Sequence, residues 1–320
     1  MSEAKGDAKG EPKGEWALVD WIRRQITLDP EAFPIGPGDD MAQVNLGGES
    51  RCLVTVDALL EGTHFDLKTA TPRQVGYKAL AVSLSDAAAM AALPVCAVTW
   101  VSLPKGRDMA FAEELNQGLY EAATKFACPI VGGDITSWDK PLTIGTALIA
   151  RSAGVKPVRR NGAKPGDFLF VTGTLGGSLL GRHLAFVPRV AEARKLAAVV
   201  SLHAMIDLSD GLSTDLHHLC HESGVAAEIE AEAIPVSEDA VAAAKHNRHT
   251  PLWHALNDGE DFELLLAVDP SDRDELVAKN PIDPLKLTCV GKVVEGKGVT
   301  LVQKDGARDP LAPSGWEHFK

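Results

Sequence analysis

The sequence is poor in aromatic residues and has no pair of cysteines at the spacing of a redox or metal motif. Aromatic residues make up 5% of the 320 residues, while alanine and glycine are abundant, so we expect close backbone packing instead of large aromatic cores. The cysteines are far apart, with no C-x-x-C pair (Cys52, Cys96, Cys128, Cys220, Cys289). This pattern argues against a disulfide framework or a structural zinc knuckle and predicts buried, reduced thiols.

A long uninterrupted hydrophobic run is also missing. The most apolar stretch, residues 79–103, contains Asp86 and Pro94 and is dominated by alanine, so we interpret it as a buried helix followed by a strand. Residues 1–14 consist mainly of glycine, lysine and acidic residues, which predicts a disordered tail and no signal peptide. We therefore expect a cytoplasmic protein without a membrane partner.

Positive charge is scarce. The chain has 32 Lys and Arg against 44 Asp and Glu, a formal net charge of −12. A negative surface argues against binding to nucleic acids or anionic membranes. An acidic ligand could still bind if metal cations or local arginines neutralised the repulsion.

The order of the expected elements indicates two domains. Residues 155–166 contain two prolines, two glycines and four basic residues, and we place the boundary there, between domains 15–152 and 153–320. Each part is long enough for a core of its own. We expect a short helix from Trp16, longer helices at 71–93, 108–126 and 213–222, and strands at 53–56, 95–103, 129–131, 142–150, 168–172, 225–229, 262–268, 287–294 and 299–302. Helices and strands are mixed without strict alternation, which favours an α/β fold of the α+β type.

An aspartate within two residues of a glycine, serine or threonine recurs five times, four times after an apolar run. The instances are Asp40, Asp57, Asp86, Asp134 and the pair Asp207 and Asp210. One such aspartate alone is usually a turn or a helix cap. Hard divalent cations prefer carboxylate oxygens, and neighbouring glycines let a polyphosphate approach backbone N–H groups. Together the five instances predict a metal cluster that binds a polyphosphate.

Two weaker signals remain open at this point. Residues 171–181 (VTGTLGGSLLG) match a strand, a glycine turn and a helix start, which fits a phosphate cradle and a structural turn equally well. His217 and His221 lie one helical turn apart, but without H-E-x-x-H we prefer a partly exposed helix face to a zinc site. The Rossmann, P-loop and protein-kinase motifs are absent.

These residues resemble the ordered motifs of the thiamine-monophosphate kinase family. The resemblance runs from Trp16 to Phe319 and rests on eight segments in the same order: 36–40 (GPGDD), 55–65 (TVDALLEGTHF), 77–90 (YKALAVSLSDAAAM), 132–136 (GGDIT), 160–167 (RNGAKPGD), 206–212 (IDLSDGL), 259–264 (GEDFEL) and 315–319 (GWEHF).

The resemblance implies the two-domain fold of the aminoimidazole-ribonucleotide-synthetase superfamily, with an N-terminal sheet that forms a barrel in a homodimer. It implies several Mg²⁺ ions, ATP and thiamine monophosphate as substrates, and transfer of the γ-phosphoryl group to give thiamine diphosphate. The implied metal ligands are Asp40, Thr55, Asp57, Asp86, Asp134, Asp207 and Asp210, of which Asp57, Asp86, Asp134 and Asp210 would be required for catalysis. Gly133, Asp134, Arg160 and Ser209 would contact the nucleotide, and His64, Glu260 and Trp316 the thiamine phosphate.

The chain departs from the family pattern at four positions: Pro37, Val56, Ile135 and Asp258. Val56 would leave one fewer side-chain oxygen near the metals, and Asp258 would add charge beside Glu260. Alternatives within the superfamily are a selenophosphate synthetase, for which the expected N-terminal cysteine is missing, and an aminoimidazole ribonucleotide synthetase. A hydrogenase-maturation relative would end in cysteine, whereas this chain ends in Lys320. An alternative of another class is a nucleotide-binding protein without activity.

Overall fold

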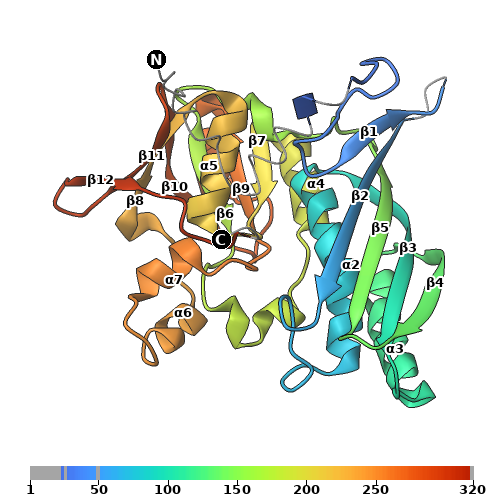
Figure 1. Cartoon of the computed structure of the whole chain (residues 1–320). Helices are drawn as coiled ribbons and strands as arrows, with labels where there is room; N and C mark the ends of the chain where they lie inside the picture. Colours follow the sequence, from blue (N-terminus) through green and yellow to red (C-terminus); the bar gives the residue numbers. More distant parts are fainter. Residues whose placement is uncertain (1–22, 25–26, 48–50, 318–320) are drawn as a thin grey trace, which may run out of the picture.

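The computed structural model describes residues 23–24, 27–47 and 51–317, and it contains two β-sheets with α2 between them (Figure 1). The expected tail 1–14 and the expected helix at Trp16 lie outside these residues. Within the described part of the chain, no helix has the length and apolar character that crossing a bilayer requires.

The first sheet has five strands in the order β1-β2-β5-β3-β4, with α2 and α3 against one of its faces (Figure 1). Its elements are β1 (Ala42–Asn45), β2 (Arg51–Leu60), α2 (Pro72–Ala89), β3 (Leu93–Pro104), α3 (Met109–Lys125), β4 (Ile130–Trp138) and β5 (Thr143–Arg151). All neighbours are antiparallel except β3 and β4. The sheet of the single chain is open, so the barrel implied by the resemblance would need a second copy.

Helix α2 begins where the sequence predicts but ends at Ala89, earlier than the expected residue 93. Thr71 is the N-cap, and its side chain accepts from the backbone N–H of Gln74 in a capping box. A Cβ on Gly76 would lie 1.9 Å from the backbone oxygen of Leu115 on α3. The expected close backbone packing is therefore present between the two helices.

Strand β4 corrects one sequence-based prediction. We expected residues 129–131 to form a short strand broken by the Gly-Gly-Asp segment, but β4 continues through it to Trp138. A Cβ on Gly133 would lie 2.0 Å from the backbone oxygen of Thr99 on β3. Glycine therefore permits the close approach of two strands here and does not end the strand.

The second sheet has seven strands in the order β12-β11-β8-β10-β6-β9-β7, antiparallel except for β8 and β11. Its strands are β6 (Phe168–Thr172), β7 (Leu202–Asp207), β8 (Ala226–Glu230), β9 (Leu264–Val268), β10 (Leu287–Val294), β11 (Gly298–Val302) and β12 (Arg308–Leu311). The helices of this part are α4 (Val190–Val199), α5 (Leu212–Ser223), α6 (Glu238–Ala243), α7 (Pro251–Asn257) and α8 (Arg273–Lys279). The mixed α/β class is confirmed.

The hydrophobic core does not divide at the boundary between the sheets. One cluster joins Leu80 and Leu84 of α2 to Met205 of β7 and Leu266 of β9. A second cluster lies within the C-terminal part, between its sheet and α5. The core of the N-terminal part therefore extends into the C-terminal part, and α2 is fixed against both sheets.

Candidate metal and substrate site

Three aspartates from distant parts of the sequence meet beside α2. Carboxylate oxygens of Asp40, Asp86 and Asp207 lie within 4.8 Å of one another, and we refer to these residues as the aspartate cluster. Asp40 precedes β1, Asp86 belongs to the last turn of α2 and Asp207 ends β7. The sequence-based prediction that scattered aspartates converge in space agrees with this geometry.

The carboxyl groups of this region repel one another. Burial, reinforced by the charges of Asp57, Asp207 and Asp40, raises the pKa of Asp86 well above its ordinary value. Burial and Asp40 raise the pKa of Asp207 to about 7, against a hydrogen bond from Ser85 and the charge of Arg160. Burial also raises the pKa of Asp57. Such a group of carboxylates is neutralised by protons or by a bound cation.

Hydroxyl groups orient these carboxylates. Thr55 Oγ1 donates to Asp86 Oδ2, Ser83 Oγ donates to Asp57 Oδ2 at 2.6 Å, and Ser85 Oγ donates to Asp207 Oδ2 at 2.6 Å. Sequence reasoning included Thr55 but missed both serines. The sequence could have indicated both serines, because they are polar positions in the mainly apolar, alanine-rich second half of helix α2.

Two arginines of the segment between the sheets hold Asp39 and Asp40. Arg160 forms two hydrogen bonds with the carboxylate of Asp40. Asp39 accepts from Arg159 Nε at 2.9 Å and from the backbone N–H of Arg160 at 2.8 Å. Asp39 is thus a structural partner of this segment, while Arg160 lies next to the aspartate cluster.

A pocket of about 330 Å³ lies next to the cluster. Its lining includes the residues assigned to thiamine phosphate and several of those assigned to metal and nucleotide: His64, Glu260, Trp316, Asp57, Ser209 and Asp210. Leu179, Val82 and Phe262 supply apolar walls. The backbone N–H of Leu60 donates to His64 Nδ1 at 3.0 Å, so the proton of the neutral imidazole lies on Nε2. The pocket is therefore amphipathic, with both acidic and apolar side chains in its lining.

The loop that carries Glu260 has a strained backbone. Glu260 and Phe262 adopt left-handed φ angles of 52° and 50°, in the region that favours glycine. The backbone N–H of Glu260 donates to the carbonyl of Ser209 at 2.6 Å, and that of Phe262 donates to the carbonyl of Leu208 at 2.8 Å. The expected strand start at residue 262 moves to Leu264, and the strained residues 260–262 turn Glu260 towards the pocket.

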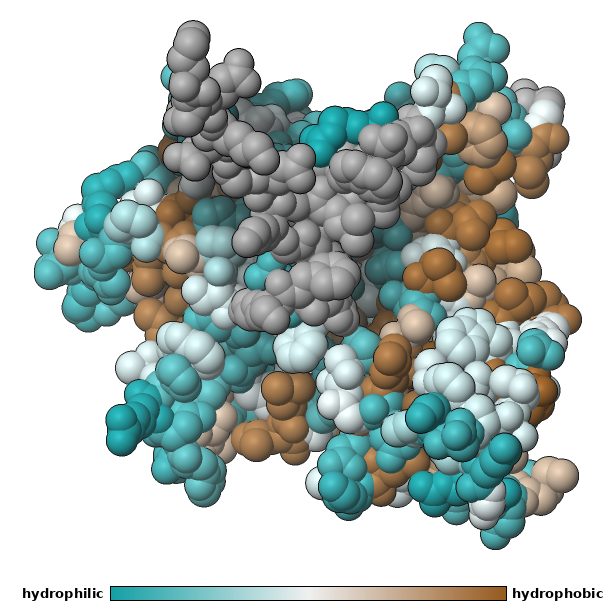
Figure 2. All heavy atoms as spheres, in the orientation of Figure 1, coloured by the Kyte–Doolittle hydropathy of each residue, from teal (hydrophilic) through white to brown (hydrophobic). Residues whose placement is uncertain are grey.

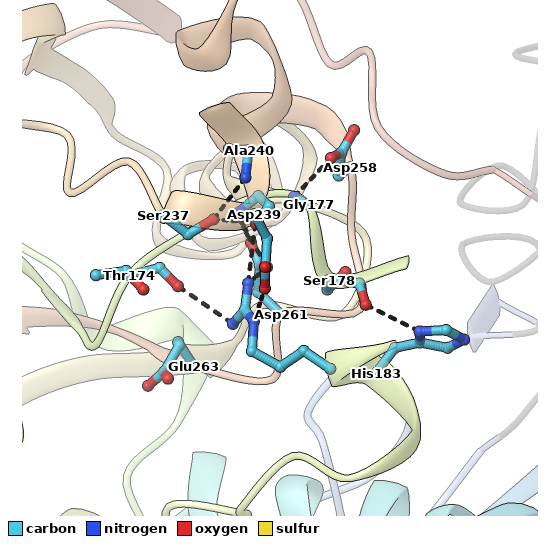
Figure 3. Close-up of polar contacts among 12 residues, drawn as sticks. Thr174, Gly177, Ser178, His183, Ser237, Asp239, Ala240, Asp258, Asp261 and Glu263 are labelled. Atoms are coloured by element: carbon cyan, nitrogen blue, oxygen red, sulfur yellow. Dashed lines mark hydrogen bonds and ion pairs between the residues drawn. The ribbon is translucent and has the colours of Figure 1, made fainter. Parts of the chain in front are cut away.

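The glycine-rich segment after β6 holds this loop and is a structural turn. The backbone N–H of Gly177 donates to Asp258 at 2.7 Å, that of Gly176 donates to Asp261 at 2.8 Å, and Ser178 Oγ donates to the carbonyl of Gly259 at 2.7 Å. Figure 3 shows Gly177 facing Asp258, with Ser178 and Asp261 beside them. Since the amides of Gly176 and Gly177 already bind carboxylates, the structure favours the structural turn over the phosphate cradle for residues 171–181.

Two of the departures from the family pattern have a structural explanation. Asp258 pairs with His254 Nδ1 at 2.8 Å and accepts from Gly177, so its charge is used in the loop scaffold. Val56 is 68% exposed on the face of β2 opposite to Thr55 and Asp57. A threonine at this position would not place its oxygen on the side of the aspartate cluster.

Gly133 and Asp134 are not brought to the cluster within one chain. Strands β5 and β3 lie between β2, which carries Asp57, and β4, which carries Asp134. Three strand spacings separate the two positions by about 14 Å, more than two ligands of one Mg²⁺ ion allow. Gly133 instead lines a groove of about 480 Å³ between β4 and α3, together with Leu115 and Asn116.

A second group of possible ligands comprises Asp210, Asp215 and His218, whose ligand atoms also lie within 4.8 Å of one another. Asp215 is 2% exposed and accepts from the backbone N–H groups of Asp210 and Gly211. Sequence reasoning missed Asp215 and His218, although both follow the Asp210 motif on α5. His217 is partly buried, with Nε2 at 2.7 Å from the carbonyl of Leu311, and His221 is exposed, as expected for a partly exposed helix face.

Comparisons with known proteins agree with this geometry. The N-terminal domain of AIR synthase related proteins matches residues 38–151, and the C-terminal domain of the same proteins matches residues 164–304. The thiamine-monophosphate kinase of Rhodopirellula baltica is 39% identical over 95% of this chain and 97% of its own length. That of Aquifex aeolicus is 33% identical over 96% and 98%.

Solved structures give the same result. A structure described as AaThiL complexed with AMPPCP and TMP superposes with a TM-score of 0.81 and 32% identity, over 96% of this chain and 97% of that one. The thiamine-monophosphate kinase of Stenotrophomonas maltophilia superposes with a TM-score of 0.72 and 31% identity, over 91% and 96%. The hydrogenase maturation protein HypE shares the fold at 18% identity. The chain therefore belongs to the thiamine-monophosphate kinase family.

Proposed function

We propose that the chain transfers the γ-phosphoryl group of ATP to thiamine monophosphate, giving thiamine diphosphate and ADP. The observation that carries the proposal is the position of the aspartate cluster next to the pocket that His64, Glu260 and Trp316 line. A pocket of about 330 Å³ suits one small substrate. The relatives' names and the complex of AaThiL with AMPPCP and TMP support the same substrates.

The donor set fits Mg²⁺. Magnesium prefers hard oxygen ligands, and the cluster offers carboxylates oriented by hydroxyl groups. Thr146 Oγ1, on the strand next to Asp57, is buried and lacks a hydrogen-bond partner among the described residues, so one more oxygen is available nearby. We assign Mg²⁺ to Asp40, Asp57, Asp86, Asp207 and Asp210. Bound there, Mg²⁺ would neutralise the phosphates of both substrates.

The residues of the pocket supply positioning. The acceptor is a phosphate oxygen that is already ionised at neutral pH, so no general base is needed, and the barrier is the repulsion between two anions. The Nε2–H of His64 is a donor suited to a phosphate oxygen. Arg160 and Ser209 are candidates for contact with the nucleotide, since Arg160 lies at the cluster and Ser209 lines the pocket.

Two residues of the pocket lining, Trp316 and Glu260, suit the thiamine ring system. The indole of Trp316 is 48% exposed and lines the pocket, where it could stack on a cationic aromatic ring. Glu260 supplies negative charge on the same wall. The two residues would thus bind the cationic part of the substrate while the phosphate points towards the aspartates.

We further propose a homodimer that buries the open face of the first sheet. This face carries Val56, Val98 and Trp100, which are 68%, 43% and 37% exposed, and hydrophobic side chains gather on the right of Figure 2 over this sheet. A contiguous apolar face of this kind favours association. Gly133 and Asp134 lie too far from the cluster of their own chain, so their assignment to the site would require the second copy.

A complementation experiment tests this arrangement. Asp57→Asn and Asp134→Asn are each expected to be inactive alone. If the two residues act at one site from different chains, each mixed dimer has one intact site, and an equal mixture recovers about a quarter of the wild-type rate. If both act from the same chain, every site in the mixture is defective and activity stays absent, which would reject the shared site.

The proposed reaction is tested directly by incubating the purified chain with ATP, Mg²⁺ and thiamine monophosphate. We expect equal amounts of thiamine diphosphate and ADP, loss of turnover on addition of a chelator, and no turnover with Asp86→Asn. ATP binding without product would favour the alternative of an inactive nucleotide-binding protein. We place the reaction in the cytoplasm, which accords with five cysteines that are free thiols.

A further inference from the structure

Lys78 is a buried charge without a role in the reaction described so far. It lies on α2, has no exposed surface and is among the largest fully buried side chains in the described chain. Burying an ammonium group costs several kcal/mol unless good partners compensate. Burial lowers the pKa of Lys78, and the charge and hydrogen bond of Glu260 oppose that effect. An apolar side chain of similar size would fill the same space without the cost of desolvating a charge, so packing alone does not explain a lysine at this position.

Both partners of Lys78 belong to the substrate pocket. Its Nζ donates to Glu260 Oε1 at 2.6 Å and to the backbone carbonyl of His64 at 2.7 Å. Lys78 therefore joins α2 to two residues of the pocket wall, 14 residues before it and 182 residues after it in the chain. Sequence reasoning gave Lys78 no role, although a single lysine in a helix of buried alanines was a visible signal.

We infer that Lys78 is a positioning residue that fixes Oε1 of Glu260 and so presents Oε2 to the substrate as an acceptor. Among the described residues Oε2 has no hydrogen-bond partner, and the side chain of Glu260 is 20% exposed. The backbone N–H of Glu260 donates to the carbonyl of Ser209 at 2.6 Å, which fixes the main chain from which the side chain projects and leaves Lys78 to hold the carboxylate. The inference rests on the proposed function, since it names the group that recognises an N–H donor or cationic ring of thiamine.

The ammonium group of a lysine donates hydrogen bonds but cannot accept them. Replacing the carboxylate of Glu260 by an amide therefore tests the inference. In Glu260→Gln the amide must give its single oxygen to Lys78, so its NH₂ group faces the substrate. A donor then meets the electropositive side of the substrate, and binding weakens strongly. If Lys78→Met is added, the amide is no longer held and can turn its oxygen to the substrate. The second substitution should therefore improve binding in this background, although it harms binding alone.

The experiment measures the Kd of thiamine monophosphate by calorimetry and the KM of both substrates for wild type, Lys78→Met, Glu260→Gln and the double variant. We expect Lys78→Met to raise the Kd about tenfold and Glu260→Gln about a hundredfold, with the double variant at least about threefold tighter than Glu260→Gln. The KM for ATP should change less than about twofold in each. The matched control is Lys195→Met, on the exposed surface of α4, with no expected effect.

A purely structural Lys78 gives a different pattern. The double variant then binds no better than Glu260→Gln, or both substrates are affected equally, and either result overturns the inference. If Lys78→Met alone does not fold, the comparison of Glu260→Gln with the charge-free double variant still decides the question. Failure of the proposed function itself is recognised separately, because the wild-type chain would then neither bind nor phosphorylate thiamine monophosphate.

Discussion

Two groups of buried acids in this chain are neutralised in opposite ways. In the aspartate cluster, as far as the structure describes the chain, an arginine hydrogen-bonds only to Asp40, while Asp86 and Asp207 are held by hydroxyl groups. A second group lies about the Glu260 loop, and we refer to Asp258, Asp261 and Glu263 as the clamp acids. Each clamp acid has a cationic or histidine partner and one further donor. Asp258 contacts His254 and Gly177, Asp261 contacts Arg182 and Gly176, and Glu263 contacts Arg189 and Thr172.

The difference separates a binding site from a scaffold. A carboxylate with a full set of protein partners stabilises the fold and has little capacity left for a ligand. A group of carboxylates held by neutral donors keeps its negative charge in excess, which only a cation or protons can balance. The number of acidic residues is similar in both groups, so the partners and not the count identify the metal site.

The largest expected effect comes from the aspartate cluster. Asp86→Asn should lower kcat by about a thousandfold or more, because one ligand for the cations is lost. The same change should stabilise the metal-free protein by about 1 kcal/mol, since it removes repulsion with Asp40 and Asp207. Turnover assays and denaturant unfolding with a chelator measure both quantities. A destabilised metal-free variant would place Asp86 in a scaffold role.

Removing a partner of a clamp acid should instead lower the stability of the protein. Arg182→Met leaves Asp261, which is 3% exposed, without its cation and should destabilise the protein by about 3 kcal/mol. Burial raises the pKa of Asp261 to about 7 despite Arg182, so the loss should be greater at pH 8, where the carboxylate is charged, than at pH 6. Unfolding at the two pH values checks this. An equal loss at both would exclude Asp261 as the cause.

Magnesium removal gives a smaller effect that depends on pH. The pKa of Asp207 is about 7 in the folded chain against 3.8 for the free side chain, so between these values the folded state holds more protons than the unfolded state. The stability of the metal-free protein should therefore fall as pH rises from about 4 to about 7. Cations replace these protons, so the gain in Tm from Mg²⁺ should be larger at pH 8 than at pH 5.5. Gains of equal size would contradict the assignment.

Local signals in the sequence predicted the acids but not their partners. Asp57 and Asp207 belong to apolar β-strands, and Thr71-Pro72 marks the start of α2, so short patterns were sufficient there. Arg160 reaches Asp40 over 120 residues and Lys78 reaches Glu260 over 182, and such pairs depend on tertiary packing. The Gly-Gly segment of β4 was predicted to break the strand. Its close contact with Thr99 on β3 is also non-local, so the local sequence gave no sign that the strand continues.

The smallest expected effect concerns Trp316, which lines the substrate pocket and belongs to neither group of acids. Trp316→Ala should raise the KM for thiamine monophosphate about tenfold, the equivalent of one stacking contact worth about 1.4 kcal/mol, and leave the KM for ATP within about twofold. Trp253 is a suitable control, because it stacks on His249 and is absent from the pocket lining. If Trp316→Ala weakened both substrates equally, the indole would support the fold of the pocket, and the thiamine end of the site would have to be assigned to other residues.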